Sequence, residues 1–565
     1  MTTTVKRQAK GQSGSGGEHV TMRRDVGVIG LLFASVGSII GSGWLFGALT
    51  AAQLAGPAAI LSWVIGGVMI LLIALVYAEL GTMFPLSGGV VRFPHIAFGS
   101  FASYTTGWIL WVAVSTTAPI EVEGALQYAT KYAPFTSEHT ASNGETVHTL
   151  TGLGYLVAVF GMAFFVLVNY FGIRWFARIN NVAVWWKLGV IVLVIVAFMV
   201  TAFHTSNFSS HGFATDGAHG VFTAIATGGI VFSYLGFRQG IELAGETNNP
   251  KRNVPIAVVG SVILTGIIYI ALQIAFIAAV RPGDLVSSHG WTNLDFANDF
   301  GPLAAIASLI GLGWLATVLY VDAIVSPADT GLIYTTVTSR VSYAMGRNGN
   351  APRNLAHTTD RGVPVIGLIV AFVIGLIVLL PFPSWQQLVG FVTSATVLSF
   401  GAGTMALAAL RRELPDAKRP FRVPFGDVIP VLAFYSSNLI VYWAGWDVDW
   451  KLFVGILLGF VLLAVYAAFR REQMPAMDWR AGASWVLPWL GGMALISYLG
   501  SYPDPSDGNR GVIGFGWGFV LILVLSALVY AIALKVRLPR DRVQEHVEQT
   551  LVEAEEEKDT LGADH

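Results

Sequence analysis

The stretch GSIIGSGWLFG, residues 37–47, places four glycines and two serines in the middle of the first long apolar segment of the chain. Glycine is a poor helix former, and serine competes for backbone hydrogen bonds in other conformations. Inside a bilayer an unpaired backbone amide is costly, so a helix is interrupted only where protein or a watery cavity satisfies the freed groups. The stretch therefore predicts a broken helix beside a polar site.

Composition places this stretch in a membrane protein. Of 565 residues, 54% are hydrophobic and only 12% are charged. About fourteen apolar runs recur between Val26 and Leu534, each long enough to cross roughly 30 Å of hydrocarbon as a helix. We therefore expect an all-α polytopic membrane protein. The absence of cysteine excludes disulfides and thiolate metal sites, and the net charge of −1 gives no reason to expect a nucleic-acid partner.

The distribution of basic residues predicts the orientation. If the spans alternate, 27 Lys and Arg residues lie on the side of the N-terminus, and four lie on the other side: Lys131, Arg281, Lys451 and Arg510. The positive-inside rule then places both termini in the cytoplasm, in an inner or plasma membrane. Four parts are expected: a disordered tail (1–25), a ten-span transport core (26–410), four further spans (411–534) and an acidic, solvated tail (535–565). A short helix in the last part is the alternative.

A second interruption is expected in the sixth span, where Gly228 and Gly229 precede SYLGF, residues 233–237. The second interruption comes five spans after the first, which is the spacing expected if spans 1–5 and 6–10 are inverted repeats whose broken helices 1 and 6 meet at the midplane. Close helix packing is the alternative role of such glycines. Freed amides suit a carboxylate and freed carbonyls suit an ammonium, so a zwitterionic amino acid matches both.

Several stretches resemble the amino acid, polyamine and organocation (APC) permease superfamily. They are GSIIGSGWLFGALTAAQLAGPAAILSWVIGG, YAELGTMFPLSGGVVRF and FSYLGFRQGIELAGETNNPKRNVP. Others are similar to its bacterial aspartate–proton symporter branch: GSGWLF, SGGVVRFP, PIEVEGALQYA, LPFPSW and ALRRELPDAKRPFRVP. The resemblance implies a five-plus-five inverted-repeat core with extra C-terminal helices.

The resemblance also implies a substrate site. The amides around Ser42 and Gly43 would bind the substrate carboxylate, and three backbone carbonyls would bind its amine, those of Ile39, Phe232 and Leu235. Phe232 falls where relatives place an aromatic gate. Tyr234 and Phe237 are expected in the wall of the site or in packing around it.

Lys187 lies nine residues after Arg178, about 13 Å into the membrane on helical rise. A lysine at such depth usually faces a cavity, a charged partner or a proton route, although it can also snorkel to the interface. In proton-coupled members of the family a lysine in this context takes the place of a sodium ion. We therefore expect the proton as coupling ion, with no bound metal and no cofactor.

Arg238 follows the second interruption directly, where many relatives carry an acidic or small residue. A guanidinium presents a fork that suits a carboxylate, so one role is to bind the side chain of an acidic substrate. The alternative is a structural ion pair with Glu242 or Asp329.

The remaining intramembrane acids are less specific. Asp329 lies near mid-depth and is a candidate for pairing with Lys187 or for proton relay. Glu121 and Glu123 are expected to line a wet outer vestibule, and Glu246 belongs to a segment that closes the cytoplasmic side in the family.

These features together predict a secondary active transporter that imports an L-amino acid, aspartate or glutamate, with a proton. A neutral or broad-range permease or exchanger is the first alternative, and a membrane amino acid sensor is the second. No catalytic residues are expected, because the sequence has no metal-site motif, nucleotide-binding loop or positioned nucleophile. The oligomeric state stays open.

Overall fold

The computed structural model describes residues 26–550 apart from short gaps at 87, 141–145, 172, 297–299, 348, 350, 360–362, 381–383, 471–473 and 503–509. The expected N-terminal tail, residues 1–25, and the end of the acidic tail, residues 551–565, lie outside the described residues.

Within these ranges, ten helical segments are long and apolar enough to cross a membrane by length and composition, and four shorter apolar helices accompany them. The longer helices are α3 (Ala59–Met83), α5 (Ser100–Ala129), α6 (Gly152–Phe171), α7 (Ile173–Thr201), α10 (Pro250–Ala279), α13 (Gly313–Arg347), α15 (Trp385–Glu413), α17 (Trp446–Arg470), α18 (Trp479–Leu499) and α19 (Phe515–Val536). The remaining helices are α1 (Val28–Ile39), α2 (Gly43–Ala55), α4 (Gly89–Phe98), α8 (Gly217–Ala226), α9 (Gln239–Glu242), α11 (Pro282–Ser287), α12 (Pro302–Leu309), α14 (Val365–Leu379) and α16 (Val428–Trp443). The four shorter apolar ones are α1, α8, α14 and α16, and α2 belongs to the same long apolar segment as α3. Four 3₁₀ turns complete the set: η1 (Gly56–Ala58), η2 (Thr205–Phe208), η3 (Phe232–Arg238) and η4 (Arg353–Ala356).

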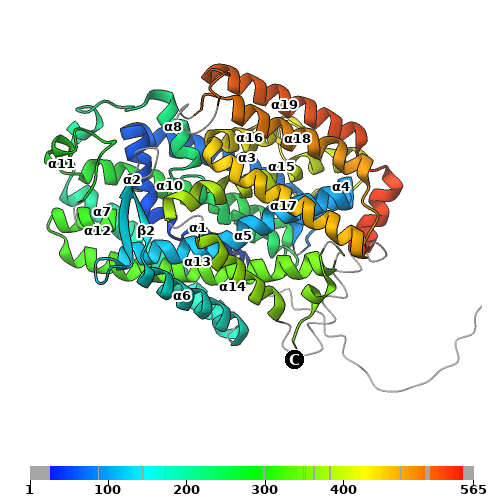
Figure 1. The fold of residues 1–565 in the computed structure, drawn as a ribbon, viewed down its shortest axis with the longest axis horizontal. Helices are drawn as coiled ribbons and strands as arrows, with labels where there is room; N and C mark the ends of the chain where they lie inside the picture. Colours follow the sequence, from blue (N-terminus) through cyan, green and yellow to red (C-terminus); the bar gives the residue numbers. More distant parts are fainter. Residues whose placement is uncertain are drawn as a thin grey trace, which may run out of the picture.

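The helices form an inner group and an outer group. In the most apolar stretch of each helix, all residues of α15 and 83% of those of α5 are buried. In the corresponding stretches of α6 and α17, only 28% and 22% of the residues are buried. Figure 1 shows α6 on one side of the bundle and α17, α18 and α19 on another, with α5 between them. Since the exposed faces of the outer helices are apolar, they suit contact with lipid.

One connection departs from the all-α expectation. Strands β1 (Thr136–Thr140) and β2 (Thr146–Leu150) pair antiparallel, with Thr136 opposite Leu150. The β-branched residues of β2 favour an extended chain, and Val147 and Leu150 bury their side chains. The interval between α5 and α6 is therefore a small hairpin.

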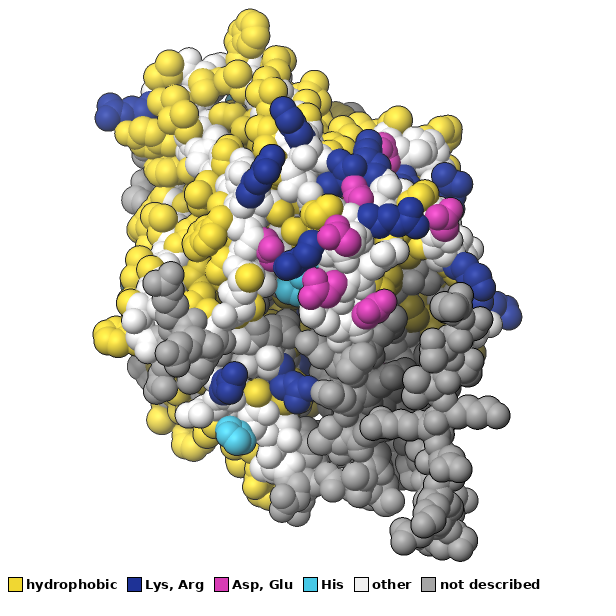
Figure 2. Space-filling view, turned by 90° about the vertical axis from the view of Figure 1, so that its right-hand side faces the viewer, with side chains coloured by type: hydrophobic (Ala, Val, Ile, Leu, Met, Phe, Trp, Pro, Cys, Tyr) yellow, Lys and Arg dark blue, Asp and Glu magenta, His cyan; other side chains and the backbone are white. Residues whose placement is uncertain are grey.

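The chain after α19 also differs from the expected solvated tail. Residues 540–550 are helical, and Val543 is only 1% exposed. The backbone amide of Leu538 donates to the carbonyl of Ala97 at the end of α4, over 3.1 Å. Figure 2 views this end of the molecule and shows acidic side chains interspersed among the basic ones. Apolar contacts thus hold the first part of the tail against the helix bundle.

Candidate functional site

The first apolar span is two helices joined by a short non-helical connection. Helix α1 ends at Ile39, and Ile40 leaves the helical conformation with φ −89° and ψ 85°. Helix α2 then begins at Gly43. The free backbone amide of Ser42 donates to Oε2 of Glu121 over 2.7 Å. The carboxylate of Glu121 therefore accepts a hydrogen bond from the Ser42 amide, which the family resemblance assigns to the substrate carboxylate.

Small residues let α5 approach this break. A Cβ on Gly41 would lie 2.5 Å from Oε1 of Glu121, so only glycine leaves room for the carboxylate. A Cβ on Gly124, one turn further along α5, would lie 2.8 Å from the Cβ of Ser42. From the other side, the indole Nε1 of Trp385 donates to Oγ of Ser42 over 2.8 Å. Helices α5 and α15 therefore hold Ser42 between them.

Lys187 is fully buried and points at the same break. Its Nζ donates to Oδ2 of Asp329 over 2.7 Å, to the carbonyl of Gly37 over 3.0 Å and to Oγ1 of Thr330 over 3.3 Å. Thr330 in turn donates to the carbonyl of Ile40 over 3.2 Å. The pairing of Lys187 with Asp329 was one of the open options in the sequence. Helices α7 and α13 thus bind the carbonyls that the break leaves free.

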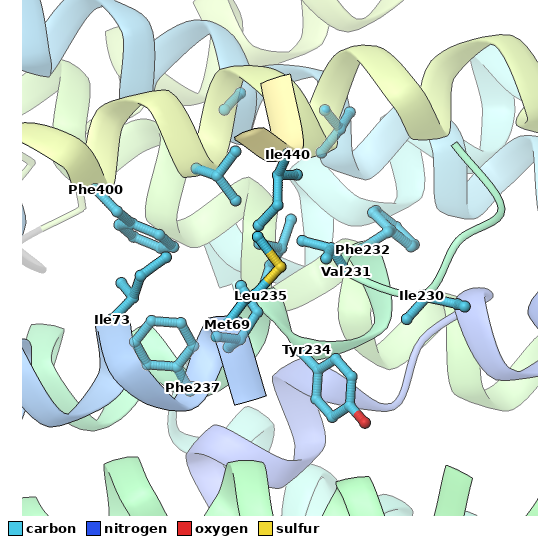
Figure 3. Packing of buried hydrophobic residues seen from close by; sticks show 14 of the residues in the cluster. Met69, Ile73, Ile230, Val231, Phe232, Tyr234, Leu235, Phe237, Phe400 and Ile440 are labelled. Carbon is cyan, nitrogen blue, oxygen red and sulfur yellow. The ribbon is translucent and has the colours of Figure 1, made fainter. Parts of the chain in front are cut away.

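The sixth apolar span is interrupted over a longer stretch. Helix α8 ends at Ala226, Gly229 adopts φ +85°, and the chain continues as the 3₁₀ turn η3. Figure 3 shows that the side chains of η3 diverge: Phe237 points toward Phe400, whereas Tyr234 points away from them. Phe237 and Tyr234 are both fully buried, consistent with packing roles.

The two breaks touch each other through glycine. A Cβ on Gly236 would fall on the backbone of Ser38 and Ile39, and a Cβ on Gly43 would collide with Oγ of Ser233. The backbones of the two interrupted spans therefore lie in direct contact, which the absence of side chains at these positions makes possible.

A narrow cavity lies where the breaks meet α5, α13 and α15. Its walls carry polar and apolar side chains: Ser38, Ile39, Thr117, Glu121, Phe232, Leu235, Thr330, Tyr334, Val392 and Thr396. Its volume, about 10 Å³ for the centre of a water-sized sphere, holds about one water molecule. The cavity is therefore too small for an amino acid, which enters only after the walls move.

The predicted site residues are distributed unevenly around this cavity. Ile39, Phe232 and Leu235 line it, and Ser42 and Gly43 flank it at the break. The Ile39 carbonyl, one of the three assigned to the substrate amine, accepts a hydrogen bond from the Tyr269 hydroxyl over 3.4 Å.

Arg238 lies behind the cavity wall. Its guanidinium stacks over the ring of Tyr334, with the Cζ atom 4.9 Å from the ring centre, and the side chain is 1% exposed. Within the described residues, its Nε and Nη1 have no hydrogen-bond partner. Tyr334 therefore separates a buried cation from the cavity.

Sequence reasoning placed Glu121 in a wet vestibule, but the structure buries it to 1% exposure at the first break. It did not single out Thr117, Thr330, Tyr334, Trp385 or Thr396. Their residue types are common in membrane helices, so no local signal separates them from packing positions. Glu121 did carry a signal, because an acid inside a span is rare.

Residues 26–481 match the family model described as amino acid permease. The chain is 39% identical over 520 residues to the glutamate/serine transporter AimA of Bacillus subtilis, a match that covers 91% of this chain and 94% of that protein. It is 33% identical over 521 residues to the aspartate-proton symporter of the same organism, covering 92% and 97%. The branched-chain amino acid permease BcaP, also of Bacillus subtilis, is 26% identical over 457 residues, covering 79% and 94%. The likeness spans both breaks and Lys187.

Proposed function

The chain belongs to the amino acid permease family of transporters, and from this premise we propose that it takes up an acidic L-amino acid, glutamate or aspartate, together with a proton. The observation that carries the proposal is the first break: Glu121, which lines the cavity, accepts the Ser42 amide there, and the buried Lys187–Asp329 pair binds the same break through the carbonyl of Gly37. Relatives named for glutamate and aspartate transport support the substrate class.

The proposed architecture is a ten-span core of two inverted repeats, followed by four further spans, with both termini in the cytoplasm. Uptake follows alternating access, in which spans 1, 2, 6 and 7 rock against spans 3, 4, 8 and 9. Lys187 on span 5 pairs with Asp329 on span 8 and donates to the carbonyl of Gly37 on span 1. This ion pair therefore couples a change of protonation at the site to movement of the broken helix.

Arg238 is proposed as the partner of the substrate's side-chain carboxylate. Two of its donors, Nε and Nη1, have no hydrogen-bond partner among the described residues and would gain from a substrate carboxylate, while Glu242 interacts with the guanidinium electrostatically. The ligand reaches it only when Tyr334 turns aside. An acidic substrate should therefore bind more tightly than a neutral one of the same size.

Transport by the purified protein in proteoliposomes tests the function. We expect labelled glutamate or aspartate to accumulate when the outside is more acidic than the inside, and unlabelled acidic amino acids to compete better than serine or leucine. Equal competition by neutral amino acids would favour a broad-range permease. Binding without flux would favour a sensor.

Lys187→Ala should abolish accumulation driven by the pH gradient. Removing one partner of a buried pair leaves the other uncompensated and costs about 3–5 kcal/mol, so the double variant Lys187→Ala with Asp329→Asn provides the control. The double variant should recover thermal stability and still fail to use the gradient. Gradient-driven uptake in either variant would contradict the proposed coupling.

A further inference from the structure

Glu121 fills the position that the family resemblance gives to the substrate carboxylate. Its Oε2 accepts the Ser42 amide at 2.7 Å, and its Oε1 lies over the bare Cα of Gly41. The side chain also lines the cavity, which has no room for a second carboxylate. An amino acid that binds the Ser42 amide must therefore displace Glu121.

Among the described residues, Lys187 acts on Glu121 electrostatically, but no cation donates a hydrogen bond to its carboxylate. An ammonium has three hydrogens, and those of Lys187 are directed to Gly37, Asp329 and Thr330. Tyr269 from α10 and Tyr334 from α13 are the other titratable side chains facing it among the described residues. Two carboxylates at one dry site cannot both be ionised, because like charges at contact distance repel strongly. A bound substrate carboxylate therefore requires a proton on Glu121.

We propose that Glu121 binds the transported proton. In the empty site its carboxylate accepts the hydrogen bond of the Ser42 amide, and protonation of Glu121 frees this amide to bind the substrate carboxylate. The inference rests on the proposed function and deepens it, because it names the group that makes uptake of an anion depend on a proton. Lys187, with its hydrogens engaged, then holds the break and does not itself carry the proton.

The cycle balances with one proton per substrate. On the outer side a proton from solution adds to a carboxylate oxygen of Glu121, and the Ser42 amide transfers its hydrogen bond to the incoming carboxylate. Protonated Glu121 gains an O–H donor and keeps a carbonyl acceptor. On the inner side the substrate leaves, the proton returns to solution, and Glu121 binds the Ser42 amide again.

Glu121→Gln tests the inference, because the amide keeps the shape and the acceptor of a protonated glutamate but does not titrate. In proteoliposomes, KM for labelled glutamate should rise for the unaltered protein with external pH, by up to about tenfold per unit. In Glu121→Gln it should change less than twofold between pH 5.5 and 7.5. This variant should also lose gradient-driven accumulation and keep counterflow exchange, which shows an intact site.

Glu123→Gln is the matched control, because Glu123 is on the same helix, is 2% exposed and does not line the cavity. It should follow the unaltered protein. Glu121→Asp keeps a titratable group and should keep gradient-driven uptake, which provides a reading if the glutamine variant fails to fold.

Three results would overturn the inference. The first is gradient-driven uptake by Glu121→Gln, and the second is a KM that is independent of pH in both Glu121→Gln and Glu123→Gln. The third is a Glu121→Asp variant that loses gradient-driven uptake while its counterflow exchange stays intact. Failure of the proposed function looks different, because the unaltered protein would then not take up acidic amino acids at any pH.

Discussion

The two interrupted spans solve the same backbone problem in different ways. At the first break, groups from other helices satisfy the backbone. Glu121 accepts a hydrogen bond from the amide of Ser42, and Lys187 and Thr330 donate to the carbonyls of Gly37 and Ile40. At the second break the backbone largely satisfies itself. Val231 donates to the carbonyl of Ile225, and Tyr234 donates to the carbonyl of Val231.

Because of this difference we call the first interruption, near Ser42, the binding break and the second, at η3, the shaping break. Partners from distant helices can exchange with a ligand, because losing one of them does not unwind the local chain. The local hydrogen bonds of η3 are part of the turn itself, so this segment offers side chains such as Phe232 and Leu235 as cavity wall. The first break is accordingly where we expect substrate binding and proton coupling, and the second is where we expect substrate size to be selected.

The largest expected effect comes from forcing the two breaks apart. In Gly236→Ala, the new methyl group would meet the backbone of Ser38 and Ile39, which cannot turn aside as a side chain can. We expect uptake to fall by at least tenfold and thermal stability to drop, by about 3 kcal/mol where unfolding is reversible. Gly189→Ala on α7 is the control, because no atom lies within 4 Å of the added Cβ. Normal uptake by Gly236→Ala would mean that the breaks need not touch.

A smaller effect should distinguish the hydroxyl groups of the two breaks. Ser42→Ala leaves the buried indole N–H of Trp385 without its acceptor, which costs about 1–3 kcal/mol. Ser233→Ala removes a hydroxyl that bonds only its own segment, at the carbonyl of Gly229. Thermal unfolding and KM should therefore change more in the first variant than in the second. Equal changes in both would remove the distinction between a binding and a shaping break.

The smallest effect concerns pH outside the membrane, and it must be separated from the pH response of the first break. Burial, then His546, then Arg92 lower the pKa of His95 on α4 from 6.5 to about 4. The His95 and His546 rings stack with centres 4.6 Å apart, so His95 anchors residues 540–550. When this segment detaches, His95 takes up a proton near pH 6.5. Docking is therefore complete above pH 6.5 and weakens as the pH falls toward 4, by about 1 kcal/mol per unit.

Hydrogen exchange of residues 540–550, corrected for intrinsic rates, should thus increase below pH 6.5. His95→Phe keeps an aromatic ring without a proton, so its exchange should not vary with pH beyond the intrinsic rate. The same variant should leave the pH dependence of KM unchanged. If KM no longer varied with pH in His95→Phe, the pH dependence of transport would have to be assigned to His95 and not to the first break.

The sequence alone predicted much of this arrangement. Apolar runs identified the membrane helices, since the length needed to cross a bilayer is a local property. The glycines near residues 41 and 229 marked where helices end, because glycine weakens a helix wherever it lies. The depth of Lys187 in its span predicted a lysine that faces a partner inside the protein, and the structure buries it against Asp329. The hairpin at 136–150 and the docking of the helix at 540–550 were missed, because each depends on packing against the bundle.

What the sequence determined by itself was where the backbone breaks and which charges enter the membrane, because both follow from short stretches and the physics of hydrocarbon. Only the tertiary structure decided which charge meets which break. Ser42 and Glu121 are 79 positions apart, and Lys187 and Asp329 are 142 apart. Glu121 and Glu123 look alike along the chain, but the rotation of α5 turns Glu121 toward the free amide and Glu123 away from the cavity. The rotation is set by packing around Gly41 and Gly124, and no local pattern encodes it.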